Sequence, residues 1–310
     1  MSRVDWAYLT RAGSERDLID ELGEPSRVEA EGVVVSGPRP KRRDGHLADP
    51  TFARQAMRRP DAVPPEPDVV NARLEPLLAS FRPRAGEEGW TWVLQVVAPD
   101  GSDPEDPRRP LAEALEAALD GAFSRWADRR RPASGATHLL QVWVVDETRV
   151  FLGFTPSGLA QSWAPAGRLR LDRPVDAVSR SGLKLEEAIQ WGGAGPEKGD
   201  IVADLGAAPG GWSQVALSRG ATVIAVDLGR VKIDAPSKRF AHLKENAFRY
   251  APPETLDWVV CDMAYRPLEV AKLLAKWGRR SWARQMIANI KLPMKKKADM
   301  VRQVLEILEA

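Results

Sequence analysis

The 310-residue chain contains one cysteine, three histidines and no long apolar run. A single cysteine excludes an intramolecular disulfide and a multi-cysteine zinc site, and three histidines leave little material for another metal site. No segment approaches the ~18 apolar residues that span a bilayer, and the amino terminus lacks the apolar region of a signal peptide. We therefore expect a soluble, cytoplasmic protein, favour a monomer, and expect neither a metal nor a membrane partner.

The first half of the chain alternates short strand and helix patterns, which predicts an α+β region over residues 1–164. A stretch rich in Pro, Arg and Asp, residues 37–67, has few periodic apolar positions and is predicted to be a long loop. The remaining patterns predict a strand at 4–9, a helix at 15–22, strands at 28–35 and 90–97, a helix from Pro110 that includes Phe123 and Trp126, and a hairpin over 138–154.

The second half, residues 165–310, has a different pattern, in which apolar strands alternate with helices. Such alternation predicts a parallel sheet with helices on both faces, a doubly wound α/β domain. The expected strands are 201–205, 222–227, 258–262 and 286–291, and the expected helices begin at Lys184 and Trp212 and cover residues 298–308.

A glycine-rich turn, Asp204 to Trp212, lies between a predicted strand and helix, at the edge where α/β sheets bind ligands. Ala208 stands where a dinucleotide fingerprint needs glycine, and Trp212 stands where a phosphate-binding loop needs lysine. S-adenosylmethionine fits best, because a helix amino terminus can bind its carboxylate and Asp227, at the end of the next strand, can bind its ribose. The alternative is a tight turn that binds nothing.

Four segments in this half carry a specific resemblance: residues 179–188, 204–212, 260–263 and 289–296. At these residues the sequence resembles the FtsJ-like, S-adenosylmethionine-dependent ribose 2′-O-methyltransferases, and it is most similar to the RlmM-type enzymes of bacterial large-subunit rRNA. The resemblance covers most of residues 165–300 and implies a Rossmann-like methyltransferase domain. The first half resembles the ferredoxin-like and THUMP-like RNA-binding region of that family in element order alone.

The resemblance also implies roles for individual residues. The family has a Lys-Asp-Lys-Glu tetrad, and the first three positions match Lys184, Asp262 and Lys291, with Lys291 as the general base. Asn246 departs from the family, which has an acid at that position for the adenine amino group; the amide oxygen could accept the same hydrogen bond. The cofactor contacts implied by the resemblance and by the turn are Ser181, Asp204, Gly206, Ala207, Ala208, Pro209, Gly210, Gly211, Trp212, Asp227, Asn246 and Asp262.

The carboxyl end of the sequence departs further from the family. After Lys291, 19 residues remain (310 − 291), enough for one helix and not for the last strands, which carry the Glu in the family. We therefore expect a doubly wound domain without its last strands. Three explanations are open: a shortened protein, a different acid in place of the Glu, or impaired activity.

A basic stretch near the carboxyl end indicates a polyanionic partner. Residues 271–300 hold nine basic residues and one acid, with Trp277 and Trp282 between them. Such a run can be a solvated face, but beside the proposed site it favours contacts with RNA phosphates. The expected function is RNA ribose 2′-O-methylation of large-subunit rRNA, and the alternatives are a catalytically impaired S-adenosylmethionine- and RNA-binding relative or a small-molecule methyltransferase. The expected RNA-binding residues are Lys272, Lys276, Arg279, Arg280, Arg284, Lys295, Lys296 and Lys297.

Overall fold

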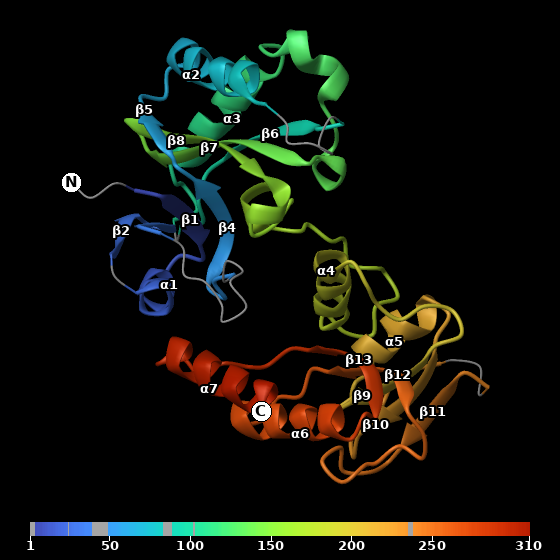
Figure 1. The fold of residues 1–310 in the computed structure, drawn as a ribbon. Coiled ribbons are helices and arrows are strands. Elements are labelled where there is room, and N and C mark those ends of the chain that lie inside the picture. Colours follow the sequence, from blue (N-terminus) through green and yellow to red (C-terminus); the bar gives the residue numbers. More distant parts are fainter. Residues whose placement is uncertain (1–3, 24, 39–48, 83–88, 102, 235–237) are drawn as a thin grey trace. The chain divides into compact units, whose positions relative to one another are not determined.

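The computed structural model describes residues 4–23, 25–38, 49–82, 89–101, 103–234 and 238–310. The chain divides into two compact units, Met1–Leu169 and Arg170–Ala310, whereas the sequence analysis places a boundary between residues 164 and 165. Figure 1 shows the elements of both units in chain order. Each unit has its own sheets and core, so each is described by itself.

The N-terminal unit begins with a four-stranded antiparallel sheet of order β2-β3-β1-β4. The strand predicted over residues 28–35 is wrong as a single element, because a turn at Glu31–Gly32 splits it into β2 and β3. Gly32 has φ +76°, and a Cβ there would lie 2.8 Å from the Asp100 carbonyl oxygen, so this turn needs glycine. The elements are β1 (Trp6–Thr10), α1 (Glu15–Leu22), β2 (Ser26–Ala30), β3 (Val33–Ser36) and β4 (Ala53–Arg58).

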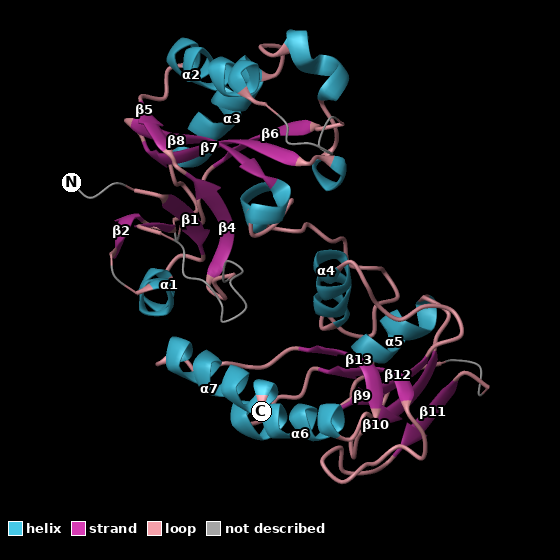
Figure 2. Cartoon of the chain, in the orientation of Figure 1, coloured by secondary structure: helices cyan, strands magenta, loops and turns pink. Residues whose placement is uncertain are grey.

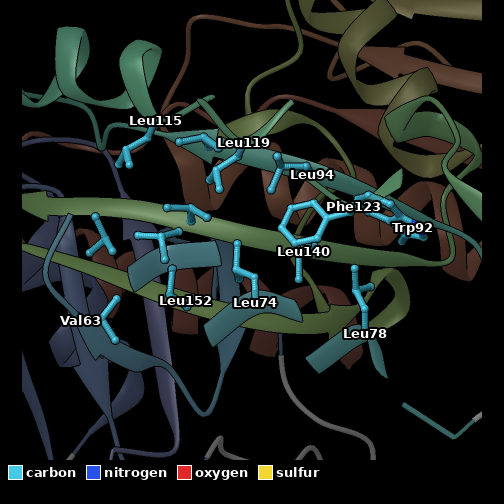
Figure 3. Close-up of a cluster of buried hydrophobic side chains, with 14 of the residues drawn as sticks. Val63, Leu74, Leu78, Trp92, Leu94, Leu115, Leu119, Phe123, Leu140 and Leu152 are labelled. Atoms are coloured by element: carbon cyan, nitrogen blue, oxygen red, sulfur yellow. The ribbon is translucent and has the colours of Figure 1, made fainter. Parts of the chain in front are cut away.

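A second sheet of the same unit has the order β5-β8-β7-β6, in which β6 and β7 are parallel and the other pairs antiparallel. Leucines from two helices and two strands form its core, among them Leu74, Leu115, Leu140 and Leu152 (Figure 3). A THUMP-like assignment of this unit stays a prediction. The elements are β5 (Asp61–Val63), α2 (Pro67–Ser80), β6 (Trp92–Val97), α3 (Arg108–Leu119), β7 (His138–Asp146) and β8 (Arg149–Pro156).

The prediction of one long loop over residues 37–67 is wrong from residue 53 onward, where the structure has strands. Residues 39–48 lie outside the described part of the chain. β4 and β5 occupy this stretch, and α2, which follows, was not expected. β4 lacks a clear apolar alternation because it buries a glutamine: Gln55 is fully buried and its amide donates to the Ser162 carbonyl at 2.7 Å. The helix expected from Pro110 ends at Leu119, before Phe123 and Trp126.

The C-terminal unit contains a five-stranded sheet of order β11-β10-β9-β12-β13, and every adjacent pair is parallel. Alternate residues of a strand face opposite sides: Val202 packs with α4 and α5, whereas Ala203 packs with α6. The predicted parallel sheet with helices on both faces is therefore confirmed (Figure 2). The elements are α4 (Gly182–Gly192), β9 (Ile201–Leu205), α5 (Gly211–Ser218), β10 (Thr222–Val226), β11 (Phe240–Leu243), β12 (Leu256–Cys261), α6 (Pro267–Arg279), β13 (Ala283–Ala288) and α7 (Lys297–Glu309).

Three elements of this unit differ from the sequence expectation. β13 covers Ala283–Ala288 rather than 286–291, so Lys291 lies three residues beyond the strand. β11 and α6 were not expected. β11 is a short and mostly exposed edge strand. α6 is an amphipathic helix that buries Leu273, Leu274 and Trp277 and exposes its basic residues. The helix expected over 298–308 is present as α7.

Two features are absent from the part of the chain that the structure describes. None of its helices is both long enough and apolar enough to cross a membrane. Nor does any group of three or more His, Cys, Asp or Glu side chains within these residues have the arrangement of a metal site.

Candidate active site

The glycine-rich turn joins the carboxyl end of β9, the central strand, to the amino terminus of α5. Gly206 and Gly210 have φ values of +76° and +120°, which favour glycine. A Cβ on Gly206 would lie 2.1 Å from Cγ of Met263, so the turn packs directly against the segment that follows β12. The turn therefore leaves backbone N–H groups of α5 facing the edge where a ligand would bind.

Asp204, near the carboxyl end of β9, is almost completely buried, with 1% of its surface exposed. The Ser213 hydroxyl donates a hydrogen bond of 2.6 Å to its carboxylate. Burial raises the pKa of Asp204 to about 7, and the negative charges of Asp227 and Asp262 contribute in the same direction. Asp204, Asp227 and Asp262 therefore lie close enough at this edge of the sheet for the charges of the last two to act on Asp204.

Asp227 follows β10 and has its carboxylate oriented by two backbone donors. The Ala208 N–H donates to one oxygen at 3.0 Å and the Gly229 N–H donates to the other at 2.6 Å. A carboxylate has about four acceptor positions, so two remain for hydroxyl groups of a ligand. This geometry suits the two hydroxyls of a ribose.

Lys184, Asp262 and Lys291 come from three distant segments of the chain and lie together. Asp262 is at the end of β12, and its carboxylate oxygens lie 3.3 Å from the Lys184 Nζ and 3.6 Å from the Lys291 Nζ. The Lys291 amine also donates to the backbone carbonyl of Asp262 at 3.3 Å. Both lysine side chains are partly exposed, at 47% and 39%, whereas the Asp262 side chain is 11% exposed. One carboxylate thus fixes two amines at a surface that a substrate can reach.

Two polar groups of this site, Asn289 and Ser213, are not among the residues expected from the sequence. Asn289 donates from its amide to the Asp262 carboxylate at 2.6 Å, and Ser213 bonds Asp204. Asn289 could have been found from its position two residues before Lys291. The Ser213 contact depends on how α5 packs on β9, and no local sequence pattern announces it.

Two other expected cofactor residues have partners within the fold. The Ser181 hydroxyl contacts the Ser179 hydroxyl at 3.0 Å, and its backbone carbonyl accepts from the Trp212 indole at 2.8 Å. The side-chain oxygen of Asn246 accepts from the Phe248 N–H at 2.9 Å. A carbonyl oxygen has a second lone pair, so Asn246 retains one acceptor position.

The expected RNA-binding residues divide between two edges of the sheet. Because α6 runs antiparallel to the strands, Arg279 and Arg280 at its end lie near the starts of the strands. Arg284 pairs there with Asp257 at 3.0 Å. On α6 itself, Lys272 pairs with Glu269 and Lys276 lies over the Trp282 ring. The segment that follows Lys291 holds the remaining three, Lys295, Lys296 and Lys297.

Known proteins resemble this chain at two levels, a family of domains and individual relatives. Residues 177–307 match the FtsJ-like methyltransferases, a range that contains the glycine-rich turn and the Lys184–Asp262–Lys291 cluster. The fold of this range is therefore that of an FtsJ-like methyltransferase domain.

The relatives of the chain are more specific. Ribosomal RNA large subunit methyltransferase M of Alkalilimnicola ehrlichii is 36% identical over 96% of this chain and 85% of its own length. The proteins of the same name from Laribacter hongkongensis and Halorhodospira halophila are 37% and 40% identical, and the matches cover 77% and 76% of this chain and 67% of each relative. The chain belongs to the family of these FtsJ-like methyltransferases. A solved structure, TrmN from Thermus thermophilus, aligns with 89% of this chain and 84% of its own at 17% identity, with a TM-score of 0.37.

Proposed function

We propose that the protein is an S-adenosylmethionine-dependent ribose 2′-O-methyltransferase of large-subunit rRNA, working in the cytoplasm where that RNA is made. The main support for this proposal is that the side chains of Lys184, Asp262 and Lys291 lie together beside the glycine-rich turn. The relatives named above are ribosomal RNA large subunit methyltransferases, which supports the same substrate class here.

The residues present fit S-adenosylmethionine. The free acceptor positions of Asp227 suit the ribose hydroxyls, and the amino terminus of α5 suits the carboxylate. The three carboxyl groups at this edge suit the positive charge of the sulfonium. When bound, this cofactor supplies a methyl group on a cationic sulfur.

Lys291 is the proposed general base for the substrate hydroxyl. An amine accepts a proton only in its neutral form, and two amines beside one carboxylate leave one positive charge uncompensated if both are protonated. Lys184 is proposed as the charged partner, while Asp262 and Asn289 position both groups. Fixed alignment of the hydroxyl contributes to rate because it removes the entropy cost of bringing the reactants together.

The RNA contacts that support this proposal best are Lys295, Lys296 and Lys297, because they follow Lys291 on the same edge. Arg279, Arg280 and Arg284 lie at the opposite edge and are proposed to act outside the immediate site. We assign residues 1–164 to RNA positioning. Looped or single-stranded RNA fits better than a duplex, because the 2′-hydroxyl must reach Lys291.

The test is methyl transfer from labelled S-adenosylmethionine to an unmodified large-subunit rRNA transcript. The modified nucleotide is then mapped by its resistance to alkaline cleavage, which 2′-O-methylation confers. Lys291→Ala is expected to abolish transfer, whereas Lys198→Ala, an exposed lysine just before β9, is expected to have no effect. Binding of S-adenosylmethionine without transfer by the wild-type protein would instead favour the catalytically impaired relative.

A further inference from the structure

Tyr265 is an exposed aromatic residue in the segment that follows Asp262, and no step described so far uses it. It follows Asp262 by three residues, so the two Cα atoms lie at most about 11 Å apart. The side chain is 52% exposed. Among the described residues, Trp191 is the other large aromatic side chain with comparable exposure, and it lies at the far end of α4 from Lys184.

A second aromatic residue holds the Tyr265 ring in place. The Phe248 ring lies 4.9 Å from it, centroid to centroid, with the planes tilted by 55°. Phe248 is itself packed against the core cluster that covers the α6 face of the sheet. The Tyr265 ring therefore has one supported side and remains open to solvent, so it can receive a flat ligand with little loss of conformational entropy.

The segment around Tyr265 also suits a nucleotide. Arg266, its exposed neighbour, can contact a phosphate. In a nucleotide, the base is attached to C1′ and the reacting hydroxyl to the adjacent C2′. A ribose whose 2′-hydroxyl lies at Lys291 therefore also brings its base close to the site. A base that leaves its stack to reach the site loses its stacking partners, and proteins commonly replace these with an aromatic ring.

We propose that the Tyr265 ring, supported by Phe248, stacks on the base of the nucleotide whose ribose is methylated. This inference rests on the proposed function, and it assigns the ring to the RNA rather than to the adenine of the cofactor. Stacking accepts any base, so Tyr265 contributes to affinity and alignment and not to the choice among the four bases.

The first experiment measures kcat/KM for an unmodified large-subunit rRNA transcript. Tyr265→Ala is expected to lower it about ten- to a hundredfold. Tyr265→Phe keeps the ring and is expected to stay within about twofold of wild type, whereas Tyr265→Leu keeps bulk without a π-face and should resemble Tyr265→Ala. Trp191→Ala is the matched control and should leave the rate unchanged.

Calorimetry with S-adenosylmethionine separates the possible sources of a defect. The stacking proposal expects the same Kd in wild type and in Tyr265→Ala, and thermal unfolding should show equal melting temperatures. A weaker Kd that accounts for the whole loss of rate would place the ring at the cofactor and overturn the proposal. Full activity of Tyr265→Ala would also overturn it, while leaving the proposed function intact. No transfer by wild type would refute the proposed function, and the stacking role with it.

The second experiment removes the base instead of the ring. Once the modified nucleotide is mapped, a short RNA is made with an abasic ribose at that position, which keeps the 2′-hydroxyl. Wild type and Tyr265→Ala should methylate this RNA at equal rates, because the stacking partner is missing in both cases. A Tyr265→Ala defect that persists on the abasic RNA would show that the ring acts on something other than this base.

Discussion

The two units of the chain treat their buried charges in opposite ways. In the N-terminal unit, Asp106 and Arg108 are both buried, and the guanidinium meets the carboxylate through bonds of 2.9 Å and 2.7 Å. These hydrogen bonds from Arg108 hold the pKa of Asp106 below its usual range. A further bond from the Arg108 guanidinium to the Glu31 carbonyl ties this pair to the turn after β2.

In the C-terminal unit, by contrast, carboxyl groups meet one another. Asp204 is buried near Asp227 and Asp262, and its pKa is raised rather than lowered. Each partner of a buried ion pair depends on the other, because removal of one leaves an uncompensated buried charge. A group of acids costs stability that a bound cation can restore. The first unit thus pairs its buried acid with a buried base, whereas the acids of the second unit lie where we propose that the cofactor binds.

The sharpest way to test this difference is to remove Asp262, which should produce the largest effect. Asp262→Asn keeps the shape of the side chain but no longer compensates the charge of Lys184 or Lys291. We expect methyl transfer to fall at least a thousandfold while the melting temperature changes little. Labelled-methyl assays and thermal unfolding check both parts. A variant that keeps more than a tenth of the activity would contradict the assigned role.

The pH dependence of stability tests Asp204. Its carboxyl is neutral in the folded protein below about pH 7 and ionised in the unfolded chain above about pH 4, so unfolding releases a proton between these values. The free energy of unfolding of the C-terminal unit should therefore fall as the pH rises from 4 to 7, by about 4 kcal/mol. Urea unfolding across this range measures it. Asp204→Asn should flatten the curve, and an unchanged slope in that variant would exclude Asp204 as its cause.

Removal of Asp106 tests the opposite expectation in the N-terminal unit. Asp106→Ala leaves a buried guanidinium without its main partner, which should cost about 3 kcal/mol of stability. The binding of S-adenosylmethionine to the C-terminal unit should be unaffected. Denaturant unfolding and calorimetry measure the two quantities. As a surface control, Asp120→Ala, which breaks an exposed pair with Arg130, should cost less than about 1 kcal/mol.

The smallest expected effect concerns the two groups of basic residues within the C-terminal unit. Changing Lys295, Lys296 and Lys297 together to Gln should reduce the slope of log affinity against log salt by about 0.7 for each RNA phosphate that is no longer neutralised. The double change of Arg279 and Arg280 to Gln, at the other edge, should reduce it less. Filter binding of rRNA transcript at several salt concentrations measures both, and a reversed order would move the RNA path to the far edge.

Much of the C-terminal unit could be predicted from the sequence, because its central strands are continuous apolar runs that end in acids. Asp204, Asp227 and Asp262 follow directly from this pattern. Lys184 and Lys291 do not: their approach to one carboxylate depends on helix and loop placement, and it was the resemblance that identified them. Asn289 was missed although it lies two residues before Lys291, whereas the Ser213 contact depends on how α5 packs on β9.

The N-terminal unit was predicted less well for a physical reason. β4 buries Gln55 by bonding its amide to a distant carbonyl, so the strand does not show the alternation that hydrophobic burial alone would produce. The turn at Gly32 splits one apparent strand into two, and its need for glycine comes from Asp100, far away in the sequence. Local periodicity cannot report contacts of this range.

The close packing of Gly206 against Met263 limits how the enzyme can change. Any side chain at position 206 would push on the residue adjacent to Asp262, so an alteration of the cofactor turn also disturbs the acid that holds the two amines. Inhibitor resistance or altered cofactor choice therefore cannot arise at position 206 alone. A smaller residue at position 263 would relieve this clash but not the strain of a side chain at φ +76°, so two independent constraints restrict position 206 to glycine.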